Sequence, residues 1–208
     1  RKLKDIQDIL DRYKNALAIE LDMVKPDQLK AAVEKVQAAF GRIDILVNNA
    51  GIGYFASLEE SEEAEIRKMF EVNFFGLSSL TQLVLPAMRQ QRSGHIINIS
   101  SIGRLVGLPP LSFYNPTKFA LARLSEALAK EVAPLGIKVT IICPSGFRTD
   151  WAGRSANENK SQIEDYQSTA AANQNNIRGY SGKQPGDPQR AAKAILKVAD
   201  TEQPPLYL

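Results

Sequence analysis

Cysteine and histidine are almost absent from the sequence, which has one residue of each kind among 208, Cys143 and His95. A lone cysteine excludes a disulfide framework and a cysteine-based metal site. A lone histidine excludes a histidine-built zinc site and a serine–histidine–aspartate triad. We therefore expect no bound metal ion, and any chemistry must depend on other side chains.

Long apolar runs and a strong excess of one charge are also lacking. No apolar run reaches the roughly 18 residues that a membrane-spanning helix needs. The 26 lysines and arginines nearly balance the 23 aspartates and glutamates, giving a net charge of +3, and they form no basic track for nucleic acid. We expect a soluble, cytoplasmic protein that binds neither a membrane nor nucleic acid.

The sequence does contain short apolar runs that alternate with longer amphipathic stretches. Apolar residues recur at helical spacing in the longer stretches, whereas the short runs are β-branched and apolar. The expected strands are 16–21, 43–47, 95–100 and 137–142, and the expected helices are 2–13, 26–40, 62–90 with Ser61 as N-cap, 114–132, and one capped by Asp187 that ends near 199. This alternation predicts an α/β fold, a Rossmann-like, doubly wound parallel sheet with helices on both faces.

Residues 1–208 are expected to form one domain. The segment 151–183 is rich in Asn, Gln, Ser and Ala, which predicts a mobile helical excursion over the site. Residues 201–208 have the composition of an approach to a further strand. In a strand order of 3-2-1-4-5-6 the first two strands are central. We therefore expect an N-terminal strand–helix–strand portion of roughly 30–40 residues to precede Arg1, and a shorter piece to follow Leu208.

The stretch from Ser100 to Lys118 carries the residues with the clearest chemistry. Tyr114 and Lys118 are four residues apart, so in a helix their side chains share one face, about 5–6 Å apart at Cβ. A lysine ammonium favours a phenolate, so the pKa of Tyr114 is expected to fall from about 10, which suits a general acid/base. Ser101 is placed to donate a hydrogen bond to the same substrate oxygen. Taken alone, the Tyr–Lys pair also fits a solvated helix face.

Polar or glycine-bearing clusters follow each of the four expected strands. Asp22 follows the first strand, 48–51 the second, 100–101 the third and 144–149 the fourth. In a doubly wound sheet the carboxyl ends of the strands form one edge, where ligands bind. Four clusters on one edge therefore predict a single elongated ligand.

Taken together, these residues resemble the short-chain dehydrogenase/reductase family over nearly the whole chain. The matching segments stand in the family's order and approximate spacing: Asn48-Asn49-Ala50-Gly51, Asn73, Ser101, Tyr114-Asn115-Pro116-Thr117-Lys118 and the turn from Pro144 to Thr149. The resemblance implies an NAD(P)-binding domain in which Tyr114 is the acid/base and Ser101 orients the substrate carbonyl or hydroxyl. It further implies that Lys118 binds the nicotinamide ribose and lowers the pKa of Tyr114, and that Asn73 holds a water in a proton relay.

The resemblance also implies which residues contact the cofactor. They are Asp22 and Met23 at the adenine, Asn49, Ala50 and Gly51 at the adenosine ribose, and Pro144, Phe147 and Thr149, with Tyr114 and Lys118, at the nicotinamide end. Two features depart from the family. Ser145 replaces the glycine that usually follows the proline, which predicts either a strained residue or a turn that follows a different path, and no glycine-rich phosphate loop is present.

From these residues and the resemblance we expect an NADP-dependent oxidoreductase that interconverts a carbonyl compound and an alcohol by hydride transfer. NADP is favoured over NAD because the basic residues Arg1 and Lys2 suit a 2′-phosphate. One alternative is a catalytically silent dinucleotide-binding regulator on the same fold. Another is a sugar-nucleotide epimerase or dehydratase, which the 48–51 motif disfavours.

Two further expectations concern the substrate and the assembly. An apolar substrate pocket is expected to be lined by Leu105, Val106, Leu108, Phe147 and Trp151. The helices 62–90 and 113–132 have apolar residues beyond one stripe, so they are expected to pair across a two-fold axis in a homodimer or homotetramer. These residues are Phe74, Phe75, Leu83, Leu85, Phe119 and Leu121.

Overall fold

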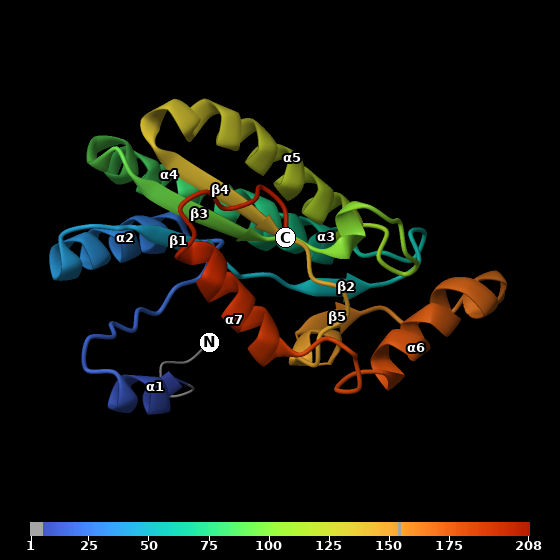
Figure 1. The fold of residues 1–208 in the computed structure, drawn as a ribbon. Helices are drawn as coiled ribbons and strands as arrows, with labels where there is room; N and C mark the ends of the chain where they lie inside the picture. The colour runs from blue at the N-terminus through green and yellow to red at the C-terminus, as the bar shows by residue number, and fades with distance from the viewer. Residues whose placement is uncertain (1–5, 154) are drawn as a thin grey trace.

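The computed structural model describes residues 6–153 and 155–208, and the main sheet of this part has three parallel strands (Figure 1). They are β1 (Ile45–Asn48), β3 (Gly94–Ile99) and β4 (Ile137–Ile142), hydrogen-bonded in the order β1-β3-β4. Near the C-terminus, Tyr207 forms a parallel bridge to Ile141 of β4. The prediction that 201–208 approaches a further strand is thus confirmed.

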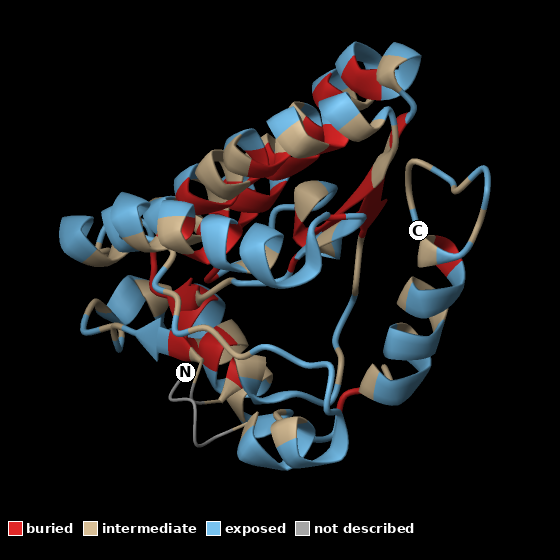
Figure 2. Ribbon diagram, turned by 90° about the vertical axis from the view of Figure 1, so that its left-hand side faces the viewer, coloured by how far each residue is buried: buried red, intermediate tan, exposed pale blue. Residues whose placement is uncertain are grey.

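Helices lie on both sides of this sheet, as predicted. On one face, α2 (Pro26–Phe40), α4 (Gly76–Gln91) and α5 (Tyr114–Val132) pack around a buried apolar cluster, and α7 (Pro188–Ala199) lies on the opposite side (Figures 1 and 2). Along β1, side chains alternate between the faces. Leu46 packs against the cluster, whereas Ile45 and Val47 point the other way and are 42% and 45% exposed. The cluster contains Val33, Ile43, Val84, Met88, Ile96, Leu128, Val132, Ile137 and Val139.

Several helix ends follow the residues that predicted them. The side chain of Asp187 accepts a hydrogen bond from the backbone N–H of Gln189 (2.8 Å), and Pro188 occupies the first position of α7. At the end of α2, Gly41 adopts the left-handed backbone with φ 75°, which glycine tolerates best. Among the described residues, none of the helices combines the length and the apolar character needed to cross a membrane.

The segment 16–21, expected to be a strand, has no regular secondary structure. A strand needs a neighbour for its backbone N–H and C=O groups. Within the described residues, β1 is one edge of the sheet and residues 206–208 extend the other, so this segment has no partner. The prediction is therefore wrong. The helix expected at 2–13 is α1 (Gln7–Arg12), and the part of that expectation before residue 6 lies outside the described residues.

The helix expected at 62–90 is interrupted by a wider turn. α3 (Glu63–Phe70) leads into a π-helical turn, Glu71–Phe75, which continues as α4. Such turns often occur at functional sites, and this one contains Asn73. Directly after it, a Cβ on Gly76 would lie 2.3 Å from the carbonyl oxygen of Met23. The chain at Met23 therefore crosses the helix where only glycine leaves room.

The expected N-cap of this helix is wrong. The hydroxyl of Ser61 donates to the carbonyl oxygen of Ser57 (2.7 Å) and makes no cap. The backbone N–H of Glu62 donates instead to the hydroxyl oxygen of Tyr54 (3.0 Å). A side chain distant in sequence has thus replaced the local cap.

A second, two-stranded parallel sheet was not predicted. β2 (Gly53–Phe55) pairs with β5 (Ala156–Glu158), which brings the chain after β1 beside the chain after Thr149 (Figure 1). The rest of 151–183 is largely helical, as expected, and includes α6 (Ala172–Gly179). The carboxylate of Glu60 accepts the backbone N–H groups of Gln162 (2.6 Å) and Ile163 (3.1 Å). These bonds tie the segment to the chain after β2, and its mobility over the site stays a prediction.

Candidate active site

Tyr114 and Lys118 open α5 and are both buried, at 6% and 5% exposure. Pro116 is the third residue of this helix, where its missing N–H costs no helical hydrogen bond. The ammonium of Lys118 donates to the carbonyl oxygen of Ile99 at the end of β3 (2.9 Å), and its nitrogen is 5.8 Å from the centre of the Tyr114 ring. The strand end and the helix start thus bring the expected pair together.

Ser101 follows β3 and meets Tyr114. Its hydroxyl oxygen accepts the backbone N–H of Gly103 (3.1 Å), and the same hydroxyl holds the pKa of Tyr114 lower than burial alone would. The next backbone N–H, that of Ile102, donates to the carbonyl oxygen of Pro144 (2.9 Å). The loops after β3 and β4 therefore support each other beside the tyrosine.

Burial has the largest effect on the pKa values of Tyr114 and Lys118. It raises the pKa of Tyr114 to about 12, and the hydrogen bond with Ser101 offsets only part of this rise. Burial also lowers the pKa of Lys118 to about 8. The expectation that the pKa of Tyr114 falls below its usual value is wrong for this structure, because the cost of burying a phenolate outweighs the stabilisation that a neighbouring ammonium can give. At pH 7 Tyr114 is a neutral phenol.

Asn73 is fully buried in the π-helical turn and has all its amide groups paired. Its Oδ1 accepts the backbone N–H of Ile52 (2.8 Å), and its Nδ2 donates to the carbonyl oxygen of Ile52 (2.9 Å) and to Thr117 Oγ1 (3.2 Å). The buried amide therefore has a partner for its oxygen and for both of its N–H groups. Asn73 joins the chain after β1 to α5, and its role in a water relay stays a prediction.

The first residue of the 48–51 motif lies in the core, and the other three lie at the candidate site. Asn48 is 4% exposed, and its Nδ2 donates to Thr81 Oγ1 (3.0 Å) and to Asn98 Oδ1 (2.8 Å). In turn, the Nδ2 of Asn98 donates to Ser125 Oγ (2.8 Å). This network links β1, β3, α4 and α5. Sequence reasoning missed it, because single polar residues on separate elements carry no motif.

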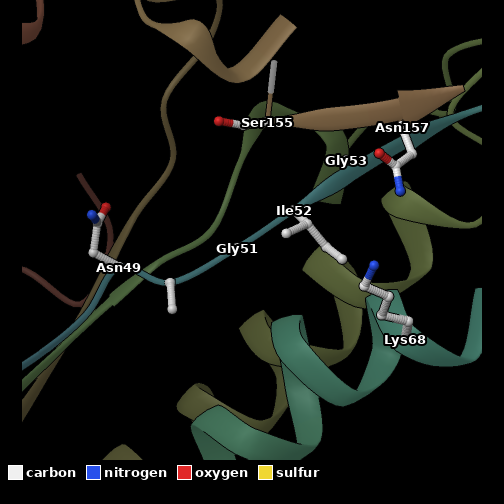
Figure 3. Close-up of a pocket in the computed structure, with 8 residues that line it drawn as sticks. Asn49, Gly51, Ile52, Gly53, Lys68, Ser155 and Asn157 are labelled. Carbon is white, nitrogen blue, oxygen red and sulfur yellow. The ribbon is translucent and has the colours of Figure 1, made fainter. Parts of the chain in front are cut away.

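The remainder of the motif lines a cavity of about 550 Å³ (Figure 3). A Cβ on Gly51 would lie 3.4 Å from Asn73 Oδ1 and 3.5 Å from Lys118 Nζ, so this side of the cavity borders the candidate catalytic groups. Across the cavity, Lys68 of α3 points its amine toward the chain at Ile52 (Figure 3). The lining residues are Asn49, Ala50, Gly51, Ile52, Gly53, Lys68, Ser155 and Asn157. The last five of these were not expected.

The remaining residues expected at the cofactor lie outside the lining described for this cavity. A carboxylate oxygen of Asp22 accepts the backbone N–H of Val24 (3.2 Å), and Met23 crosses the helix at Gly76. Phe147 forms a bridge with Gly186. The hydroxyl oxygen of Thr149 accepts the backbone N–H of Trp151 (3.3 Å). Their contacts with a cofactor stay predictions.

The strain expected at Ser145 is absent. Among the described residues, Arg92 is the only non-glycine residue with a positive φ, 54°. The turn after Pro144 therefore follows a path that needs no glycine.

The expected apolar pocket forms only in part. Trp151 packs on Tyr114, with ring centres 4.9 Å apart. Leu105, Val106 and Leu108 are instead 62%, 48% and 41% exposed. Among the described residues, no cluster of His, Cys, Asp and Glu side chains is arranged to hold a metal ion.

Comparisons with known proteins agree with this geometry. A family model described as short chain dehydrogenase matches residues 1–160. Oxidoreductase BOA17 of Botryotinia fuckeliana is 37% identical over all of this chain and 76% of its own length. A short-chain dehydrogenase from Streptomyces avermitilis has a TM-score of 0.91 at 40% identity, covering all of this chain and 75% of that one. A gluconate 5-dehydrogenase from Burkholderia cenocepacia, in complex with NADP and tartrate, has a TM-score of 0.69 at 29% identity, covering 74% of this chain and 62% of that one.

Fold and site together define an oxidoreductase of the Rossmann-like α/β class. Because the family model matches most of the chain, the chain belongs to the short-chain dehydrogenase family. It is an NAD(P)-dependent short-chain dehydrogenase/reductase.

Proposed function

We propose that the protein is an NADP-dependent oxidoreductase that interconverts a carbonyl compound and an alcohol, with Tyr114 as the acid/base. The observation that carries the proposal is the buried phenol of Tyr114, which stands one helical turn from the buried ammonium of Lys118. A titratable group whose pKa is moved by burial beside a cavity is a candidate for proton transfer. A silent regulator of the same fold has no need of such a proton donor.

In the direction of reduction, the chain's own groups handle the proton. Tyr114, with a pKa raised to about 12, is protonated at pH 7 and donates its proton to the carbonyl oxygen. Ser101 lies against the tyrosine hydroxyl, so both groups reach the same oxygen. Lys118, with a pKa near 8, is charged at pH 7 and stabilises the phenolate that remains. A bound nicotinamide dinucleotide supplies the hydride and takes it back in the reverse direction.

The residues around the cavity fit such a cofactor. Gly51 presents only backbone beside Lys118 and Asn73, so a ribose can approach the lysine without meeting a side chain. Asn49, Ala50, Gly51 and Lys118 would hold this part of the dinucleotide. The NADP complex of the related gluconate 5-dehydrogenase supports NADP over NAD. Arg1 and Lys2, on which that preference first rested, lie outside the described residues.

A cofactor-consumption screen tests the proposal. Ketones and aldehydes are mixed with the protein and NADPH or NADH, and alcohols with NADP or NAD. We expect at least one carbonyl compound to be reduced, with a higher kcat/KM for NADPH. A higher kcat/KM for NADH would overturn the cofactor preference. Tight NADPH binding without turnover of any compound would favour the silent regulator instead.

The proposal extends to assembly as a homodimer or homotetramer. Phe75 and Phe119 are 51% and 50% exposed on neighbouring helices, and an apolar groove of about 340 Å³ lies beside Phe75 between Ile66 and Phe70. Leu121, also expected at this interface, is buried in the core and takes no part. Light scattering at micromolar concentration tests the assembly, and a monomer would contradict it.

A further inference from the structure

Trp151 fills the space beside the candidate proton donor. Its indole ring packs on Tyr114 with ring centres 4.9 Å apart, and it meets the edge of Phe55 at 5.5 Å. A Cβ on Gly53 would lie 2.9 Å from Cζ2 of the indole. The ring therefore occupies a slot that needs a glycine on β2, directly against the candidate proton donor.

The turn that carries Trp151 is held by one distant side chain, Arg178 of α6. Its guanidinium donates to the carbonyl oxygens of Ala152 (3.0 Å), Gly153 and Ala156 (2.7 Å), directly after the tryptophan. A guanidinium offers five donors in a fixed fork, and these contacts use most of them on backbone oxygens. Ala152, Gly153 and Ala156 are therefore held by an arginine that follows Trp151 by nearly thirty residues.

The same arginine is itself held on two sides. Its Nε donates to Glu158 Oε2 (2.8 Å), which also accepts Nε2 of Gln174 (3.0 Å). Its guanidinium carbon lies 4.8 Å from the centre of the Phe55 ring, a distance at which a cation and an aromatic face attract. A continuous series of side-chain contacts thus runs from α6 to the start of α5, through Arg178, Phe55, Trp151 and Tyr114.

We propose that Trp151 is the specificity-determining wall of the substrate site, and that Arg178 is a positioning residue that holds it against Tyr114. The wall admits carbonyl compounds whose substituent next to the reacting carbon is small or flat, and it excludes branched ones. The part concerning specificity rests on the proposed carbonyl reduction. The part concerning position does not depend on turnover.

Tryptophan fluorescence tests the position, because Trp151 is the only tryptophan in the 208 residues. Trp151→Phe gives the residual emission to subtract. In Arg178→Gln we expect emission at longer wavelength and stronger quenching by acrylamide than in the wild type. Arg178→Lys keeps the charge over Phe55 but loses the fork, so its emission should fall between the two.

Arg42→Gln is the matched control, since Arg42 bonds the exposed Asp44 at the opposite end of β1. It should leave the emission unchanged. Unchanged emission in a folded Arg178→Gln, as judged by circular dichroism, would overturn the positioning role. If that variant does not fold, Arg178→Lys and Glu158→Gln carry the same test.

Kinetics test the specificity with 2-butanone and 3,3-dimethyl-2-butanone, which differ by two methyl groups on the carbon next to the carbonyl. In Trp151→Ala, the kcat/KM of the branched ketone relative to the unbranched one should rise about tenfold or more. This ratio of kcat/KM values should rise less in Arg178→Gln, and it should not change in Arg42→Gln. An unchanged ratio in Trp151→Ala, or no reduction of either ketone by any variant, would overturn the specificity. Fluorescence still decides the positioning role in that case, so the two failures are distinguishable.

Discussion

The candidate site is built from two regions that are held in different ways. The first, from β3 to the start of α5, supplies Ser101, Tyr114 and Lys118 and lies within the sheet and its helices. The second, from 150 to 186, supplies Trp151 and is held by side-chain bonds such as those of Arg178 and Glu60. Regions with few buried apolar contacts open more easily than core strands and helices. We therefore expect the groups for proton transfer to open only with the core, and the segment that carries Trp151 to open locally.

The largest expected effect is on catalysis in the first region. Lys118→Met removes a buried ammonium one turn from Tyr114, so the phenolate loses its stabilising charge. We expect kcat/KM to fall by about 100-fold or more, and cofactor affinity to fall as well. Steady-state kinetics and cofactor titration measure both, with the exposed Lys130→Met as control. A loss of only a few-fold would show that the first region does not depend on this charge.

The second-largest expected effect is a difference in the free energy of unfolding between a variant in the first region and one in the second. Asn98→Leu removes the acceptor of Asn48 and the donor to Ser125 in the buried network. We expect the free energy of unfolding to fall by about 2–3 kcal/mol. In the second region, Gln174→Leu breaks one bond to Glu158, which keeps Arg178 as partner, so its cost should stay below about 1 kcal/mol. Urea unfolding compares the variants, and equal losses would remove the distinction.

The pH dependence of stability sharpens the description of the first region. The pKa of Lys118 is about 8 in the folded protein, against 10.5 for a fully hydrated lysine side chain, the value expected in the unfolded chain. Between these values the unfolded state binds more protons, so this lysine makes the free energy of unfolding increase with pH. Its full contribution is about 3 kcal/mol.

Urea unfolding of the wild type and of Lys118→Met between pH 7 and 10 measures this contribution. The free energy of unfolding of the wild type should increase with pH relative to that of Lys118→Met. Tyr114, with its pKa raised to about 12, acts in the opposite sense only above pH 10. A difference that stays constant would mean that Lys118 is not desolvated.

The smallest expected effect is local and lies in the second region. Glu60→Gln weakens the carboxylate that accepts the N–H groups of Gln162 and Ile163. We expect faster proteolysis near 161–163 and no measurable change in global unfolding. The exposed Glu34→Gln serves as control. A shift of the global transition would indicate that the two regions unfold as one.

The first region could be predicted from the sequence because its residues obey local spacing rules. Tyr114 and Lys118 are four residues apart and share a helix face, so the helical period places both. The pKa of Tyr114 was predicted in the wrong direction, because spacing shows a neighbouring charge but not the burial that outweighs it.

The helical character of the second region was predicted, but its contacts with the rest of the molecule were not, because they join residues distant in sequence. β2 and β5 are short strands without alternation, and the bonds of Arg178 to Ala152 and Ala156 leave no local pattern. The segment 16–21 failed for the opposite reason. Its composition suits a strand, but a strand also needs a neighbour, which the described residues do not provide.

The central claim is that the buried phenol of Tyr114 transfers the proton. The most direct measurement compares turnover and cofactor affinity in one preparation of Tyr114→Phe, with the exposed Tyr13→Phe as control. Removing only the hydroxyl should abolish turnover and leave the Kd of the cofactor nearly unchanged, whereas Tyr13→Phe should keep both. Substantial turnover by Tyr114→Phe would contradict the account and require another group to supply the proton.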